Sequence, residues 1–197
     1  VHGANRLFVN GVANSTVFGA VAGDAMAAFA KGQGLREPDR AALEAAVERC
    51  ETPFRKRSAA AKSLEPMREE LFDTMWERVG IIREAAGLAA AQGELDRLDA
   101  ELDAHALSDA NRAFNLTWHD WMNLKSLVAV SRAIATAAIA REDSRGAHFR
   151  SDFPETGALE QSAFTSIAVE DSKFRLRMKP VAFSRVRPGQ SLLKNAA

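Results

Sequence analysis

Apolar residues recur every three or four positions along most of the chain, the period of an amphipathic helix. The spacing predicts a first helix that begins near Asn14, where three residues can cap a helix, and ends at Gly32. Its apolar stripe comprises Val17, Phe18, Val21, Ala25 and Phe29. A second helix is expected from Pro38, a residue suited to a first turn, to about Cys50.

Longer helical patterns follow. The first begins at Ser63, with Pro66 in its first turn, and the last is a long helix predicted from about Asp109 to Arg141. The stripe after Ser63 consists of Met67, Leu71, Met75, Val79 and Ile82, and it continues through Leu88, Leu95, Leu98 and Leu102. These patterns predict a mainly α fold, an antiparallel bundle of about three long helices.

The pattern changes after residue 150. Pro154 and Gly157 interrupt helix, and residues 163–169 form a plausible strand. Residues 173–179 then alternate strictly between charged and apolar side chains, as a half-buried strand does. With residues 170–172 as the turn, the sequence predicts a small β-hairpin, followed by a tail from Pro188.

Composition narrows the function without identifying it. The chain has 197 residues, 47% of them hydrophobic, which is enough for a packed core. Its 26 basic residues balance 26 acidic ones, which excludes a general nucleic-acid binder. A single cysteine, Cys50, excludes an internal disulfide and a cysteine-based metal cluster. The apolar run at residues 127–140 is too short and too polar to span a bilayer, so we expect a soluble, cytoplasmic protein. We also expect no bound metal.

The first nineteen residues form a loop rich in glycine and asparagine that leads into a helix, with Arg6 near its centre. Amide groups at a helix start have no intrahelical acceptor and can meet an anionic ligand. The chain begins inside this loop and without methionine, so we expect it to be a piece of a larger protein.

Three segments, in order, carry a resemblance to one family. The first is Gly3-Ala-Asn-Arg-Leu7 with Asn10 and Val17-Phe-Gly19; the second is Met75-Trp76 with Val79-Gly-Ile-Ile-Arg83. The third runs from Arg141 to Pro154 and contains Ser144-Arg-Gly-Ala-His148. Together they resemble the succinate dehydrogenase/fumarate reductase flavoprotein family, which also contains L-aspartate oxidase. The resemblance therefore does not fix the substrate.

The resemblance implies an FAD-dependent oxidoreductase that moves a hydride between FAD and a small carboxylic acid. It implies that residues 1–34 end the FAD-binding domain, 35–150 form the helical domain, and 151–197 form the hairpin and tail. The Gly-x-Gly-x-x-Gly fingerprint and the capping domain are not in this sequence, so we expect no catalytic residue here and an inactive chain. The implied partners are those missing domains, a small dicarboxylate, and an iron–sulfur subunit that could hold the protein at the inner membrane.

The resemblance also implies the site residues. Arg6 would bind a substrate carboxylate, and Asn10, Gly11 and Val12 would present amide groups to the flavin. A guanidinium grips a carboxylate with two parallel hydrogen bonds, and a helix start stabilises negative charge on reduced flavin. The sequence departs from the family where Phe8 and Val9 replace two glycines.

Other polar residues receive structural interpretations. We expect Arg145 and His148 to link the bundle to the hairpin or to face a neighbouring domain, although such a cluster could bind an anion. His119 has no second ligand at helical spacing. The acidic run of residues 96–103 is interpreted as a solvated helix face. The alternative function is a non-catalytic helical interaction module, and in either case we expect an exposed apolar face and a homodimer.

Overall fold

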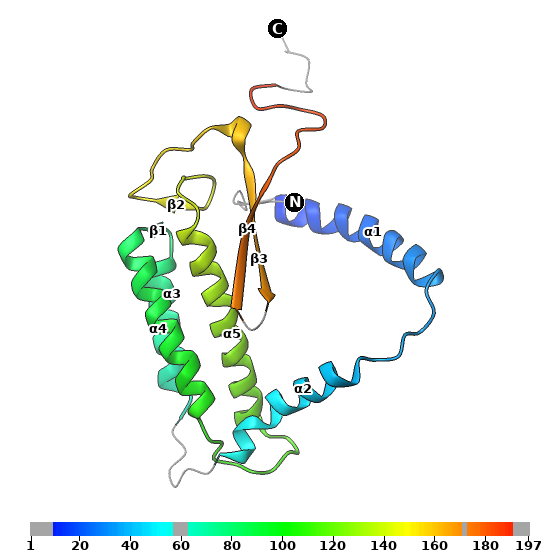
Figure 1. Ribbon diagram of the computed structural model, residues 1–197, viewed down its shortest axis with the longest axis vertical. Helices are drawn as coiled ribbons and strands as arrows, with labels where there is room; N and C mark the ends of the chain where they lie inside the picture. The colour runs from blue at the N-terminus through cyan, green and yellow to red at the C-terminus, as the bar shows by residue number, and fades with distance from the viewer. Residues whose placement is uncertain (1–9, 57–62, 171–172, 191–197) are drawn as a thin grey trace.

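The computed structural model describes residues 10–56, 63–170 and 173–190, and it is mainly helical (Figure 1). The helices are α1 (Asn10–Lys31), α2 (Arg40–Glu51), η1 (Thr52–Arg55), α3 (Glu65–Val79), α4 (Ala85–Ala104), α5 (Leu116–Ile139) and η2 (Leu159–Gln161). The strands are β1 (Ile82–Arg83), β2 (Phe149–Arg150), β3 (Ala163–Glu170) and β4 (Lys173–Pro180).

Helices α3, α4 and α5 form the predicted bundle, which surrounds one apolar core (Figure 1). Two hydrogen bonds show that α4 and α5 are antiparallel. Gln92 pairs with Thr136 near one end, and the indole of Trp121 donates to the Leu102 carbonyl near the other at 2.9 Å. The stripe residues fill the core, whose members include Leu71, Val79, Leu88, Leu95, Leu98, Leu102, Leu124 and Val128.

Helix α5 begins seven residues later than predicted because Asn115 caps it. The side-chain oxygen of Asn115 accepts a hydrogen bond from the Trp118 amide at 2.8 Å. Its amide nitrogen donates to the carbonyls of Asp109 and Asn111, so the preceding segment is held as a turn. The prediction of helix from Asp109 was wrong, since apolar periodicity does not report such local bonds.

The chain leaves α3 at Gly80 and forms β1 before entering α4. Ile82, which was placed on the apolar stripe, is therefore 66% exposed, and that assignment was wrong. β1 pairs with β2 as a short parallel ladder in which Ile82 faces Phe149 and Arg83 faces Arg150. This ladder joins the second and third sequence motifs.

The predicted hairpin is confirmed. β3 and β4 are antiparallel, in a register that runs from Ala163 opposite Pro180 to Glu170 opposite Lys173. The hairpin lies beside α5, where the guanidinium of Arg132 sits 5.7 Å from the centre of the Phe174 ring (Figure 1). The two residues of the turn itself lie outside the described residues.

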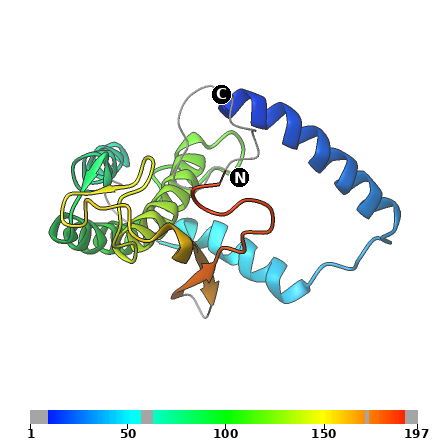
Figure 2. The same cartoon turned by 90° about the horizontal axis from the view of Figure 1, so that it is seen from above.

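Helices α1 and α2 extend away from the bundle, as two views of the molecule show (Figure 1 and Figure 2). α2 is attached through η1, where Phe54 contacts Trp118 edge-on at 4.9 Å and the Trp118 indole donates to the Cys50 carbonyl. Asp39 caps α2, so Pro38 lies just before the helix and not in its first turn as predicted. α1 keeps Val17, Val21 and Phe29 exposed.

Two helices, Gly11–Lys31 and Leu116–Ile139, have the length and composition needed to cross a membrane. A core helix of a soluble protein passes the same test, and α5 supplies Trp121, Leu124 and Val128 to the core. The absence of a membrane span therefore stays a prediction.

Candidate functional site

The predicted flavin-binding residues lie at the amino end of α1. Arg6 lies outside the described residues. Asn10 and Gly11 open the helix, and Val12 is 74% exposed. The first turn contains no acidic residue, so no carboxylate of that turn caps its amide groups. This end of α1 is chemically suited to an electron-rich ligand.

A second group of polar residues forms where the two later motifs meet. Arg83 comes from β1, next to the end of α3, and His148 comes from the loop before β2, where a bridge pairs it with Arg145. A guanidinium nitrogen of Arg83 lies 2.8 Å from Nδ1 of His148, across 65 positions of the sequence. The short β1–β2 ladder sets this contact, because it places residue 83 beside residue 150.

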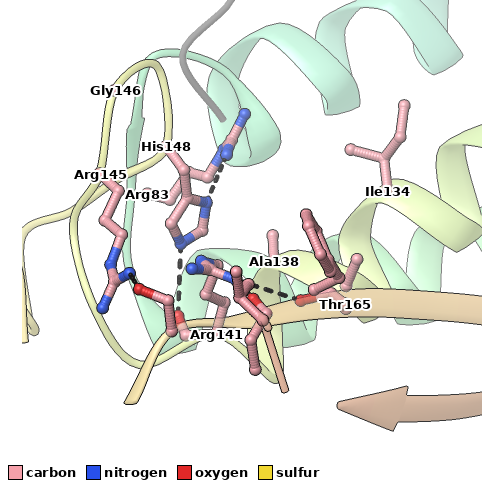
Figure 3. A pocket seen from close by; sticks show the side chains of 13 residues that line it. Arg83, Ile134, Ala138, Arg141, Arg145, Gly146, His148 and Thr165 are labelled. Atoms are coloured by element: carbon pink, nitrogen blue, oxygen red, sulfur yellow. Dashed lines mark hydrogen bonds between the residues drawn. The ribbon is translucent and has the colours of Figure 1, made fainter. Parts of the chain in front are cut away.

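These residues line a pocket of about 520 Å³ between the loop of residues 141–148, called here the motif loop, α5 and the hairpin (Figure 3). Its polar lining is Arg83, Arg141, Arg145, His148, Ser162 and Thr165. Its apolar lining includes Ile134, Ala138, Phe164 and Val181. Figure 3 shows His148 between Arg83 and Arg141, with Ile134 and Ala138 presented from the helix. The pocket lining thus combines cationic and apolar side chains.

The hydrogen bonds of His148 define its state. Because Nδ1 faces a guanidinium, it serves as the acceptor, and Nε2–H then points to the Arg141 carbonyl at 3.3 Å. Burial is the main cause that lowers the pKa of His148. The charges of Arg83 and Arg141 also lower it, and together these causes outweigh the hydrogen bond to the Arg141 carbonyl and the charge of Asp143, which raise it. The imidazole is therefore neutral at pH 7 and holds the Arg83 side chain in place.

Positive charge exceeds negative charge around this pocket. Asp143 lies 3.0 Å from Nε of Arg141 and 2.6 Å from Nε of Arg145, so two guanidiniums share one carboxylate. Arg83 forms no ion pair with any described carboxylate, and burial lowers the pKa of its side chain. Its Nε donates instead to the carbonyls of Val79 and Gly80.

Arg150 has a structural role beside the pocket. Its side chain is 2% exposed, and one nitrogen donates to the carbonyls of Ala138, Ile139 and Arg141 at the end of α5. The other two nitrogens donate to the carboxylate of Asp152 at 2.7 Å each. Hydrogen bonding from Arg150 lowers the pKa of Asp152, which also accepts a bond from the Ala85 amide at the start of α4.

The remaining predicted residues can now be placed. Arg145 donates to Ser162, Thr156 and Ala158, which agrees with a role in linking the bundle to the hairpin segment. His119 is exposed, and no group of three metal-ligating side chains occurs in the described part of the chain.

The acidic run on α4 is paired rather than simply solvated. Asp99 and Asp103 both bind Lys125 of α5, while Asp96 and Asp99 bind Arg132. Burial lowers the pKa of Lys125, but hydrogen bonds to Asp103 and Asp99 outweigh it and raise that pKa overall. The run therefore joins two helices.

Arg83 and Arg150 were not assigned a role from the sequence. The sequence signal that could have found them is their position inside the second and third motifs. In the structure, Arg83 contacts a residue distant along the chain and Arg150 contacts the end of a helix. No pocket-lining residue comes from α1, so the predicted flavin-binding residues and the arginine pocket are separate sites within the described residues.

Comparisons with known proteins identify the family. Residues 68–192 match the family model described as "Fumarate reductase flavoprotein C-term". The fumarate reductase flavoprotein subunit of Mycobacterium tuberculosis is 30% identical over 196 residues, which are 96% of this chain and 34% of the relative. The 8-methylmenaquinol:fumarate reductase flavoprotein subunit of Wolinella succinogenes is 30% identical over 156 residues, 78% of this chain and 25% of the relative.

A solved structure agrees with the sequence comparison. The structure of Mycobacterium smegmatis Sdh1 in complex with UQ1 superimposes with a TM-score of 0.69 and 27% identity, covering 78% of this chain and 26% of the other. The chain thus spans about a quarter to a third of the length of these relatives. On this sequence and structural evidence, the chain belongs to the fumarate reductase flavoprotein C-terminal family.

Proposed function

We propose that this chain is the C-terminal part of an FAD-dependent oxidoreductase that interconverts a small dicarboxylic acid and its unsaturated counterpart. The observation that carries the proposal is the family match over residues 68–192, together with relatives that are 30% identical and named as fumarate reductase flavoprotein subunits. The chain covers only part of those relatives, so the activity belongs to a longer protein.

The amino end of α1 suits the proposed cofactor. FAD, when bound, supplies the two-electron chemistry that moves a hydride to or from carbon. The residues that would hold it are Asn10, Gly11 and Val12, through amide groups that no acidic side chain of the first turn occupies. The positive end of the α1 dipole would stabilise negative charge at this place.

Arg6 is the proposed substrate-binding residue of this chain. Its guanidinium would orient the substrate by two parallel hydrogen bonds to one carboxylate, and it stays charged at every pH of interest. The helical bundle would act as a scaffold, and the FAD-binding and capping domains would complete the site. An iron–sulfur partner subunit would keep the protein peripheral to the membrane.

The test is made on the product of the full-length gene. We expect bound flavin, visible as absorbance near ~450 nm, and we expect the reduced flavin to be reoxidised when fumarate is added. Arg6→Gln should abolish reoxidation while flavin absorbance remains. Arg36→Gln is the control, because Arg36 is exposed in the linker after α1 and bonds only Gln33 among the described residues. A folded product without flavin would contradict the proposal.

Two observations favour a second function. α1 exposes Val17, Val21 and Phe29, and Phe8 and Val9 replace two family glycines next to the predicted flavin. If these bulky residues close the flavin site, the chain acts as a helical interaction module through the apolar side of α1. The same experiment separates the two functions, because this one requires a folded, flavin-free protein.

A further inference from the structure

We propose that the pocket between the motif loop, α5 and the hairpin is a binding site for a carboxylate attached to a short apolar chain. No described residue of α1 lines this pocket, and the argument for it does not depend on flavin chemistry. It concerns the two motifs that the proposed function leaves without a role.

The first argument is the charge of the pocket. Three guanidiniums, those of Arg83, Arg141 and Arg145, line it, and Asp143 is the carboxylate in ion-pair contact with two of them. Among the described residues, no carboxylate contacts Arg83. A half-buried cation without a counter-ion attracts an anion more strongly than an exposed one, because the surroundings screen it less.

The second argument is that Arg83 is fixed in position, while one of its terminal nitrogens has no acceptor among the described residues. Its Nε is held by the Val79 and Gly80 carbonyls at 2.9 and 3.0 Å, and one terminal nitrogen is held by His148. None of the described residues accepts a hydrogen bond from the other terminal nitrogen, Nη2. A rigid guanidinium loses little side-chain entropy on binding, which favours a ligand oxygen.

The third argument identifies the rest of the ligand. Besides the arginines, the pocket lining includes aliphatic and aromatic side chains, among them Ile134, Phe164 and Val181, of which Figure 3 shows Ile134 presented from α5. A fully hydrated inorganic anion would gain nothing from these side chains, whereas a hydrocarbon chain gains by leaving water. A volume of about 520 Å³ has room for a four- to six-carbon acid.

The carboxylate could come from a free organic acid or from an acidic side chain of another part of the protein. The chemistry of recognition is the same in both cases: a guanidinium pairs with the carboxylate, and the apolar side chains cover the carbons. Comparing the chain with the longer flavoprotein proposed above distinguishes the two sources.

The experiment is a calorimetric titration of the purified chain with hexanoate, hexanol and sulfate at pH 7.5. We expect saturable binding of hexanoate in the millimolar range. Hexanol and sulfate should bind at least about tenfold more weakly, because hexanol lacks the carboxylate and sulfate lacks the hydrocarbon chain. Arg83→Gln should weaken hexanoate binding about tenfold or more. Arg175→Gln is the matched control, since Arg175 is an exposed arginine on β4 and should change the affinity less than about twofold.

A second variant keeps the test informative if Arg83→Gln does not fold. Ile134→Glu places a carboxylate among the apolar lining residues, at a side chain that is already 42% exposed, and it should abolish hexanoate binding. Binding to the chain but not to the longer flavoprotein identifies a protein carboxylate as the occupant; binding to both identifies a free acid. Absence of saturable binding to the chain, or equal binding to Arg83→Gln, overturns the proposal.

Discussion

Arg150 shows how one charged residue can lie in a protein interior without remaining unpaired. Its three side-chain nitrogens all have partners, which are three carbonyls near the end of α5 and both oxygens of Asp152. We expect Arg150→Met to lower the free energy of unfolding by about 3 kcal/mol or more, since it leaves the helix-end carbonyls and a carboxylate without donors. Urea unfolding followed by circular dichroism measures this change.

The control for that prediction is Arg175→Met on the hairpin. Arg175 is 55% exposed and lies 3.8 Å from Glu170, so its loss should cost less than about 0.5 kcal/mol. Equal changes in the free energy of unfolding for the two variants would show that the bonds from Arg150 to the carbonyls at the end of α5 do not stabilise the fold.

His148 should make stability depend on pH. Burial, with the charges of Arg83 and Arg141, lowers the pKa of His148 in the folded state, while the unfolded value stays near ~6.5. Below ~6.5 the unfolded chain therefore binds more protons, and the free energy of unfolding falls as the pH is lowered from ~7.5 to ~5.5. Thermal unfolding at a series of pH values measures the slope.

His148→Asn should reduce that slope, because the asparagine oxygen can accept the Arg83 hydrogen bond without titrating. Part of the slope should remain, since burial also lowers the pKa of His105. His119→Asn, at an exposed position of α5, is the control and should leave the slope of the parent protein. A slope unchanged by His148→Asn would contradict a buried, neutral imidazole.

Sequence reasoning at the residue scale succeeded where contacts are local. The structural role expected for Arg145 agrees with its bonds to Thr156, Ala158 and Ser162, all within 17 positions of it. The partnership of Arg83 with His148 was not predictable, because it spans 65 positions and depends on how β1 meets β2. The roles of Arg6, Asn10, Gly11 and Val12 stay predictions.

At the scale of helices and strands, replacing two glycines by alanine should have opposite effects on stability. A Cβ on Gly80, where α3 ends, would lie 2.2 Å from the Trp76 carbonyl oxygen, whereas a Cβ on Gly93, inside α4, would meet nothing within 4 Å. We expect Gly80→Ala to destabilise the protein by about 2 kcal/mol or more, and Gly93→Ala to stabilise it by about 0.5–1 kcal/mol. Urea unfolding of both variants checks this pair, and a stabilising Gly80→Ala would contradict the structure.

Elements were predicted well where their pattern is strong, and their boundaries were set by chemistry outside that pattern. The alternation of residues 173–179 identified β4, because Phe174 and Leu176 are half-buried between exposed charged neighbours, and Phe174 lies against Arg132 of α5. The start of α5 was missed because Asn115 holds Asp109 and Asn111 in a turn. β1 and β2 have two residues each, too few for any period to register.

On the scale of the whole molecule, we expect α1 to determine how the chain behaves in solution. Its apolar stripe is exposed, with Phe18 at 46% and Phe29 at 66%. We expect the isolated chain to self-associate through this stripe, since burial of such surface is favourable. Size-exclusion chromatography with light scattering should show a dimer.

The matched variants lie on opposite sides of α1. Phe29→Glu places a charge in the stripe and should give a monomer, whereas Ala27→Glu places it on the far side, about 180° around the helix from Phe18, and should leave the dimer. A monomer for the parent chain at high concentration would rule out this surface.

The β1–β2 ladder also has a consequence for the order in which the molecule folds. Helices α4 and α5 are joined by residues 105–115, but pairing Arg83 with Arg150 closes a much longer loop that contains both helices. Because closing a longer loop costs more entropy, we expect the helices to pair first and the ladder to form last.

Pulse-labelling hydrogen exchange can follow this sequence of events. The amide of Ser151, which donates to the Arg83 carbonyl at 2.8 Å, should become protected after that of Val128 in the core. Simultaneous protection would contradict the order. The arginine pocket takes Arg83 from β1 and His148 from the loop before β2, so it should exist only in molecules that have completed folding. A ligand bound there would select those molecules.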